Sequence, residues 1–233
     1  MVDHSNPIYC ALDVPTRDAA AALAKRLGTA VGGLKLGLEF FCGQGPDGVR
    51  ALAATGLPVF LDLKLHDIPN TVASAIRALA PLGVSLVNVH AGGGPAMMRA
   101  AAEAAAEAGE TRPKVLAVTV LTSLDAADLD AVGVSAAPRD QVLRLATLAR
   151  ASGLDGVVCS AQEIAAVRAA CGPDFLIVVP GIRPAGSAAG DQKRMATPEQ
   201  AMADGADILV IGRPITGAED PQAAARAILA GLR

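Results

Sequence analysis

Short apolar runs, rich in β-branched residues, alternate with longer Ala- and Leu-rich runs from one end of the chain to the other. The short runs have the length and composition of strands, and the longer ones carry helical patterns. Strands are predicted at residues 8–12, 33–36, 59–65, 86–90, 115–121, 156–159, 176–180 and 208–211. Helices are predicted at residues 17–27, 46–55, 71–82, 95–108, 139–152, 161–170, 198–204 and 221–232, with a short extra helix at 124–131.

Proline and glycine mark the ends of these helices. Several helices have a Pro near the first turn, and many end at a Gly. A regular order of strand and then helix predicts a parallel sheet covered by helices. Eight such units predict an α/β fold with a single (β/α)8 TIM barrel, forming one domain over residues 1–233. A doubly wound open sheet is the alternative, but the first unit lacks a G-x-G-x-x-G turn.

Composition narrows the functional classes. The chain has 233 residues, of which 52% are hydrophobic and 18% charged, so it can bury a large core. A net charge of −3, only five aromatic residues and no Trp do not favour binding of nucleic acid or of a membrane surface. No apolar run is long enough to span a bilayer, and no signal peptide is recognisable. Cys10, Cys42, Cys159 and Cys171 form no C-x-x-C pair, which indicates a cytoplasmic protein without a zinc or redox motif.

Polar residues collect at the carboxyl ends of the predicted strands. Asp13 follows the first strand, Lys35 lies in the second, and the third carries Asp62 and Lys64. Active sites of such barrels lie at this end, and both faces of a barrel strand are covered, so a solvated face is a poor explanation. Asp62 and Lys64 lie about 6.6 Å apart on one side of an ideal strand, and a structural ion pair remains an alternative for them. Asp67 also fits a helix N-cap.

The last two strands point to a phosphate group. The eighth predicted strand ends in Gly212-Arg213-Pro214, and the seventh runs into Pro180-Gly-Ile-Arg183. Loops after strands seven and eight often bind phosphate in these barrels. A glycine lets backbone amides approach an oxyanion, and an arginine offers a two-pronged donor. A surface arginine on a tight turn is the alternative.

The run Asp62-Leu-Lys64-Leu-His-Asp67-Ile-Pro-Asn-Thr71 resembles the D-x-K-x-x-D signature of the orotidine 5′-phosphate decarboxylase family. The resemblance covers nearly the whole chain, through motifs at residues 11–13, 34–35, 87–91, 120–123, 155–161, 180–184, 190–192 and 210–214. Related sugar-phosphate decarboxylases of the same superfamily carry a similar D-x-K-x-x-D, so the I-P-N-T extension is the specific part. Residues 91–93 read Ala-Gly-Gly where some relatives have Ala-Ser-Gly.

The resemblance implies a homodimer that converts orotidine 5′-monophosphate (OMP) to UMP, the last step of de novo pyrimidine nucleotide synthesis, without a metal or an organic cofactor. By position, Lys64 is the implied proton donor, and Asp62 lies beside it at the substrate carboxylate. Lys35 is the implied third member of the charged array. Asp67 and Thr71 are expected to complete the active site of the partner subunit.

The resemblance also implies a set of substrate-binding residues. They are Asp13, Lys35, Asp62, Thr71, Thr122, Arg183, Gln192, Gly212 and Arg213. Asp13 is expected at the ribose hydroxyls and Thr122 near the pyrimidine. Gln192, Gly212 and Arg213 are expected at the phosphate, and Arg183 on the loop of residues 181–196 that closes over it.

Three other functions compete with this prediction. A β-keto sugar-phosphate decarboxylase of the same superfamily normally recruits Mg²⁺. A Schiff-base aldolase would use Lys64 or Lys35 as a nucleophile, although a lysine between carboxylates suits proton donation better. A barrel that only binds a phosphate ligand is the third alternative, and the intact motif positions argue against it.

Overall fold

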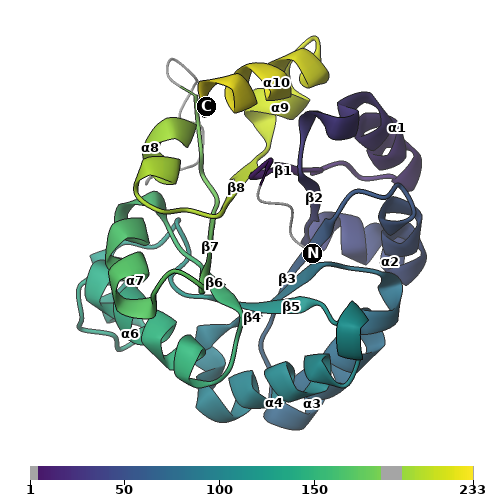
Figure 1. Cartoon of the computed structure of the whole chain (residues 1–233). Coiled ribbons are helices and arrows are strands. Elements are labelled where there is room, and N and C mark those ends of the chain that lie inside the picture. The colour runs from purple at the N-terminus through teal and green to yellow at the C-terminus, as the bar shows by residue number, and fades with distance from the viewer. Residues whose placement is uncertain (1–4, 185–195, 233) are drawn as a thin grey trace.

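The structure, a computed structural model, describes residues 5–184 and 196–232 and contains all eight predicted strands (Figure 1). They are β1 (Ile8–Ala11), β2 (Gly33–Leu36), β3 (Val59–Leu65), β4 (Leu86–His90), β5 (Lys114–Val118), β6 (Gly156–Val158), β7 (Leu176–Val179) and β8 (Ile208–Ile211). The strands pair in parallel and in sequence order, and β8 pairs with β1 to close the sheet. The predicted (β/α)8 barrel is therefore confirmed.

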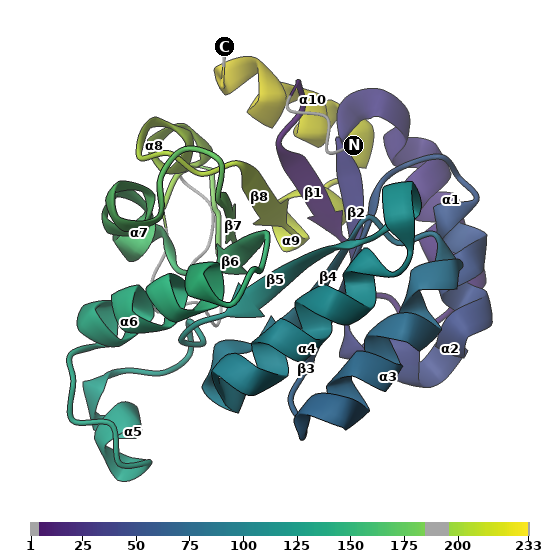
Figure 2. The ribbon, with the colours of Figure 1, turned by 60° about the horizontal axis from the view of Figure 1, so that its bottom comes forward.

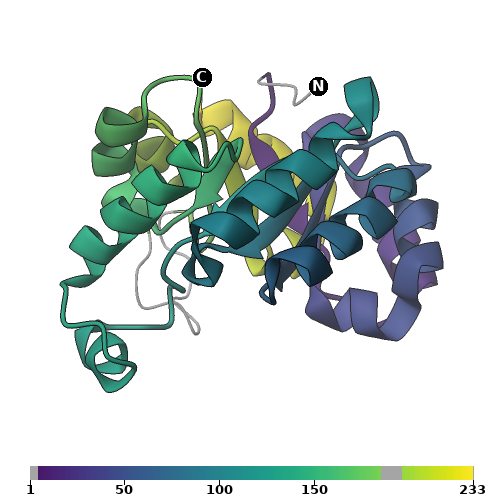
Figure 3. The ribbon, with the colours of Figure 1, turned by 90° about the horizontal axis from the view of Figure 1, so that it is seen from below.

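Helices occupy the connections and form a ring around the strands (Figure 1). They are α1 (Arg17–Leu27), α2 (Leu38–Ala53), α3 (Pro69–Leu79), α4 (Gly94–Ala106), α5 (Ala126–Ala131), α6 (Pro138–Ala151), α7 (Ile164–Cys171), α8 (Pro198–Ala203), α9 (Arg213–Thr216) and α10 (Pro221–Gly231). Single 3-10 turns are η1 (Gly28–Ala30), η2 (Ala80–Leu82), η3 (Ala91–Gly93), η4 (Gly109–Thr111) and η5 (Ala161–Glu163). Helix α5 stands apart from the ring, on a long connection that leaves β5 (Figures 2 and 3). In the described part of the chain, no helix combines the length and apolarity needed to cross a membrane.

Side chains alternate along each strand between two apolar cores. The core inside the barrel contains Tyr9, Ala11, Phe60, Leu86, Leu116, Leu176, Val178, Ile208 and Val210. The neighbouring residues in the strands, such as Leu34 and Leu61, pack in the larger core between strands and helices. Lys35 and Asp62 each lie one position after such an outward residue, so the two-residue period aims them into the barrel. The fold therefore directs these two charges inward.

Several element boundaries differ from those predicted. Helix α2 begins at Leu38 rather than at residue 46, with a kink at Gly45, whose φ is 59°. Gly43, Gly45 and Pro46 indicate a helix break, so the first half of α2 was missed. Strand β5 ends at Val118 rather than at residue 121. Helix α9 has only four residues, too few for a helical pattern to be visible in the sequence.

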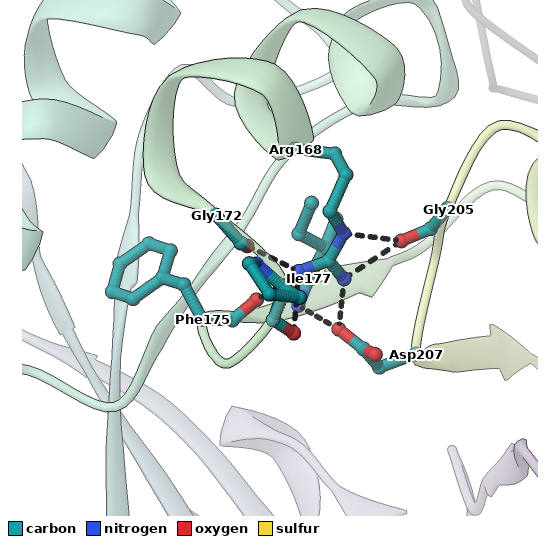
Figure 4. A network of polar contacts seen from close by, with 7 residues as sticks. Arg168, Gly172, Phe175, Ile177, Gly205 and Asp207 are labelled. Carbon is teal, nitrogen blue, oxygen red and sulfur yellow. Dashed lines mark hydrogen bonds and ion pairs between the residues drawn. The ribbon is translucent and has the colours of Figure 1, made fainter.

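One arginine ties together the N-terminal ends of β7 and β8 (Figure 4). The guanidinium of Arg168 donates to the carbonyl oxygens of Gly172, Pro173, Phe175 and Gly205 and to Asp207 Oδ2, at 2.6–3.2 Å. The same Asp207 oxygen accepts the backbone N–H of Ile177 at 2.7 Å. Asp207 directly precedes β8, so a single ion pair fixes where two strands begin.

The same arrangement recurs at β5 and β6. Asp155 directly precedes β6 and accepts the backbone N–H of Val115 in β5 at 2.8 Å. Arg112 forms a two-pronged pair with Asp155, at 2.6 and 2.9 Å. Both networks lie at the N-terminal end of the barrel. Active sites of such barrels lie at the opposite end, where the strands have their carboxyl ends.

Candidate active site

Three consecutive strands bring four charged side chains into contact at the carboxyl end of the barrel. Lys35 Nζ lies 3.0 Å from Asp13 Oδ1 and 3.8 Å from Asp62 Oδ2. Lys64 Nζ lies 2.7 Å from Asp62 Oδ1. The result is a continuous array of alternating sign, in the order Asp13, Lys35, Asp62 and Lys64. The side chains of Lys35 and Asp62 are only 12% and 15% exposed, so the centre of the array is shielded from solvent.

Strand β3 reaches this geometry through an irregularity. Leu61 pairs with Val87 and Leu65 with Val89, so β3 advances by four residues while β4 advances by two. Lys64 lies inside this bulge and has a φ of 53°, the only positive φ among the described non-glycine residues. Bulges are frequent beside active sites because they redirect a side chain. In this irregular strand, Lys64 Nζ and Asp62 Oδ1 are in direct contact at 2.7 Å.

Asn88 of β4 completes the array, although the sequence assigned it no role. Its Oδ1 accepts the backbone N–H of Lys64, and its Nδ2 donates to Asp62 Oδ1, both at 2.7 Å. The side chain is fully buried. The available signal was its position: Asn88 lies two residues after Leu86, whose side chain is in the barrel core.

A cavity of about 170 Å³ adjoins the charged array. Asp62 and Lys64 form its polar wall, and Thr122 also lines it. The other walls are mostly apolar, formed by Phe60, Val118, Val120, Leu121, Val158, Cys159, Pro180 and Val210. Charges that face an apolar enclosure interact more strongly than charges in water. The cavity therefore suits a largely apolar group that carries its charge on the side facing Asp62 and Lys64.

Two stacked histidines lie next to the array. The rings of His66 and His90 are 5.2 Å apart with an interplanar angle of 11°. Burial lowers the pKa of His90 from its usual value, and the charges of His66 and Lys64 lower it further. His90 Nδ1 accepts the backbone N–H of Gly92 at 3.2 Å, which also requires that nitrogen to be unprotonated. His90 is thus a neutral neighbour of Lys64 at neutral pH.

Asp67 and Thr71 lie at the start of α3 with exposed side chains. Asp67 Oδ1 accepts the N–H of Ile68 at 2.7 Å, and the N-cap residue of α3 is Ile68, so the N-cap interpretation of Asp67 is wrong. Within the described residues, none of the ion pairs includes Asp67. In the part of the chain that the structure describes, neither side chain is part of the array of its own chain.

Three of the residues predicted for phosphate are described: Arg183 follows β7, Gly212 directly follows β8, and Arg213 begins α9. A Cβ added to Gly212 would lie 3.4 Å from the Ala11 Cβ and 3.9 Å from Asp13 Oδ2, which places Gly212 next to the first strand's end. Arg213 is the exposed first residue of α9. Arg183 donates its backbone N–H to Ala196 O at 3.0 Å, so the two ends of the 181–196 loop are held together. Gln192 lies outside the described residues.

The carboxylates of the site are engaged in ion pairs. Each of its two carboxylates contacts an ammonium group. No group of three potential metal ligands from His, Cys, Asp and Glu occurs in the described ranges 5–184 and 196–232. Burial raises the pKa of the Cys10 thiol to about 12; Asp13 raises it and Lys35 lowers it. Cys10 is therefore protonated at neutral pH and unsuited to act as a nucleophile.

Comparison with known proteins identifies the family of the chain. A model of the "Orotidine 5'-phosphate decarboxylase / HUMPS family" matches residues 6–228. The chain is 59% identical to orotidine 5′-phosphate decarboxylase of Sphingopyxis alaskensis, over 98% of this chain and 100% of that protein. It is 57% identical to the protein of the same name from Paramagnetospirillum magneticum, over 97% of this chain and 98% of the relative.

A solved structure gives the same result in three dimensions. The crystal structure of orotidine 5′-phosphate decarboxylase from Lactobacillus acidophilus superposes with a TM-score of 0.87 at 39% sequence identity, over 98% of this chain and 99% of the other. The similarity in sequence and the similarity in fold thus both extend over nearly the full length of this chain. The chain belongs to the orotidine 5′-phosphate decarboxylase / HUMPS family.

Proposed function

We propose that this protein decarboxylates OMP to UMP, and that Lys64 is the proton donor. The observation that carries the proposal is the continuous array of Asp13, Lys35, Asp62 and Lys64 beside a mostly apolar cavity. The names of the relatives, which share more than half of the sequence, support the same substrate. The reaction needs a fixed cation where negative charge develops, and the array supplies one.

The chemistry explains why an ammonium group is required. When the bond between C6 and the carboxylate breaks, CO2 leaves and the electron pair stays on C6, in an orbital that cannot delocalise into the pyrimidine ring. The Lys64 ammonium stabilises this pair and then transfers a proton to C6, which gives UMP. The neutral amine regains a proton from solvent, so the cycle consumes one proton and releases one CO2.

Asp62 holds the donor and faces the leaving group. Its contact with Lys64 at 2.7 Å fixes the ammonium, and Lys35 braces the other carboxylate oxygen at 3.8 Å. Repulsion between two carboxylates about 4 Å apart is worth roughly 4 kcal/mol at an effective dielectric constant near 20. Enzymes lower barriers by about 8–23 kcal/mol, so this repulsion is one contribution among several.

Binding of the remote parts of the substrate is proposed to supply much of the rest. Asp13 and Lys35 bind the ribose, and Thr122 contacts the pyrimidine from the wall of the cavity. Arg183, Gln192, Gly212 and Arg213 bind the phosphate, helped by closure of the 181–196 loop. Remote binding that excludes water and orients the reacting carbon raises the rate as well as the affinity.

The active unit is proposed to be a homodimer in which Asp67 and Thr71 complete the neighbour's site. The exposure of both side chains supports this arrangement. Ile68 between them is 67% exposed, which is unusual for a large apolar side chain and is typical of a contact surface. We also propose that residues 1–233 form one domain and that the protein acts in the cytoplasm, where scattered cysteines stay reduced.

The reaction is proposed to need neither a metal ion nor an organic cofactor. In the array, the carboxylates of Asp13 and Asp62 are already neutralised by Lys35 and Lys64. A divalent cation would have to displace these ammonium groups before it reached the carboxylates. A Mg²⁺-dependent sugar-phosphate decarboxylase is the rival function, and it differs in its response to chelation.

The decisive experiment follows the loss of OMP absorbance in the presence of EDTA. The wild type is expected to turn over, because the array itself carries the charge. Lys64→Ala is expected to lose at least about 10³-fold in kcat, since it removes the proton donor. Lys25→Ala, which changes an exposed lysine of α1, is the matched control and should retain the wild-type rate. Inactivity of the wild type, or activity that EDTA abolishes, would refute the proposal.

A further inference from the structure

Asn88 makes the only side-chain contact in the described chain that joins the backbone of Lys64 to the carboxylate of Asp62. Its Oδ1 accepts the Lys64 N–H and its Nδ2 donates to Asp62 Oδ1, both at 2.7 Å. Asp62 Oδ1 is also the oxygen that contacts Lys64 Nζ at 2.7 Å. Asn88, Lys64 and Asp62 therefore form a closed ring of polar contacts. Asn88 is the fully buried member of this ring.

Chemistry determines which way the Asn88 amide points. The Lys64 N–H can only donate, so it must meet Oδ1, and Nδ2 then faces the Asp62 carboxylate, which can only accept while ionised. A carboxamide supplies one acceptor and one donor from the same planar group. An aspartate at this position keeps the acceptor and loses the donor, whereas an alanine loses both.

The hydrogen bond from the Lys64 N–H to Asn88 Oδ1 holds a backbone conformation, a positive φ, that lysine does not favour. A positive φ is sterically unfavourable for a non-glycine residue, and such residues persist only where their surroundings hold them. At Lys64, with φ 53°, the bond to Asn88 Oδ1 replaces the ladder contact that the bulge interrupts. Without that bond, the Lys64 N–H would be a polar group without its partner in a partly buried strand.

We propose that Asn88 is a positioning residue for the proton donor, which holds Lys64 by its backbone and Asp62 by its carboxylate. The inference deepens the proposed function and rests on it for its kinetic readout. Asn88 is not in the lining of the cavity, so it acts through the two charged residues and not on the substrate. Its loss therefore slows the chemical step more than it weakens substrate binding.

The kinetic test compares Asn88→Ala and Asn88→Asp with the wild type. We expect kcat to fall about 100-fold in both, the size seen when one preorganised donor is removed, with KM for OMP changed less than about 3-fold. Thr119→Val is the matched control: Thr119 is equally buried, and its hydroxyl donates to Val158 O at 2.9 Å, outside the array. This variant controls for lost stability and should keep the wild-type kcat.

A second readout, amide hydrogen exchange at Lys64, does not depend on activity. Exchange should accelerate in Asn88→Ala, where the acceptor is lost, and stay close to the wild type in Asn88→Asp, where an oxygen remains. A kcat within about 3-fold of the wild type in Asn88→Ala, or a rise in KM that accounts for the whole loss, would overturn the positioning role while leaving the proposed function intact. If the wild type itself fails to turn over OMP, the proposed function fails, and unchanged exchange at Lys64 would then overturn the positioning role separately.

Discussion

At the scale of single residues, Lys64 combines a charged side chain with an unfavourable backbone. Its φ is 53°, and its ammonium group contacts Asp62 at 2.7 Å. Strained backbone at a functional site persists where the surroundings hold it, here through Asn88. The unfavourable backbone conformation thus lies at the residue whose ammonium group contacts the carboxylate two positions earlier.

Two variants separate the strain from the charge. Lys64→Gly and Lys64→Ala both remove the ammonium group and leave Asp62 without its partner, so these losses cancel in the comparison. Glycine accepts a positive φ without a steric penalty. Lys64→Gly is therefore expected to be more stable than Lys64→Ala by about 1 kcal/mol, or roughly 2–4 °C in Tm for a chain of this length. This difference is what remains of a relief of about 1–2 kcal/mol at the positive φ after glycine's entropy cost of about 0.5–1 kcal/mol. Thermal unfolding measures it, and a Tm for Lys64→Gly more than about 4 °C below that of Lys64→Ala would show that this φ carries no strain.

The sequence predicted some of these residues and missed others for a physical reason. Asp62 and Lys64 share the two-residue period of a strand, so their meeting followed from the pattern. The bulge at Lys64 left no signal, because it depends on how β3 pairs with β4. Asn88 lies in the motif at residues 87–91 but was assigned no role, because a buried amide looks the same in sequence whether it joins a site or only satisfies the core.

At the scale of secondary-structure elements, the bounds of several strands were predicted well, and a short helix after the last strand was missed. The strands β2, β3, β4 and β8 have the predicted bounds, since apolar runs flanked by glycine or proline define them. Helix α9 was missed because four residues cannot show a period. The N-terminal contacts of Arg168 were also missed, since they join carbonyl groups, which every residue carries.

The Arg168 network leads to a prediction about stability. Arg168→Ala would leave Asp207 without its cation and the carbonyl groups of Phe175 and Gly205 without their donor. Breaking one partner of a largely buried pair typically costs about 3–5 kcal/mol, so Tm should fall by roughly 6–20 °C.

The matched control for this prediction is Arg77→Ala. Arg77 also forms a two-pronged pair, with Glu107, but on the surface. Hydrogen bonding to Glu107 raises the pKa of Arg77, yet exposed pairs contribute little to folding, so little change in Tm is expected. Equal losses in the two variants would contradict the assigned role of Arg168. Both measurements are thermal unfolding curves of the purified variants.

At the scale of the whole molecule, the charged array does not include two of the residues expected in the active site. Asp67 and Thr71 are exposed at the carboxyl end of the barrel, next to the exposed Ile68. If they serve a neighbour's site, two differently damaged chains should repair one another. That property distinguishes a shared site from a dimer whose sites are independent.

Coexpression of Lys64→Ala and Asp67→Ala chains tests this directly. Each variant alone should be nearly inactive, but a mixed dimer contains one site with both residues intact. Random pairing should restore about a quarter of the wild-type rate. Coexpression of Lys64→Ala with Lys35→Ala is the control, because both changes fall in a chain's own array and no intact site can form. Absence of recovery in the first pair, or a fully active monomer, would exclude the shared site.

The pairing of β1 with β8 has a consequence during protein synthesis. Ile8 and Leu209 are partners across the last seam of the sheet, although they come from opposite ends of the chain. The first strand leaves the ribosome early, yet one of its edges has no partner until residues 208–211 have been made. A growing chain therefore carries an unpaired strand edge for most of its translation, a state that invites aggregation and that molecular chaperones shield.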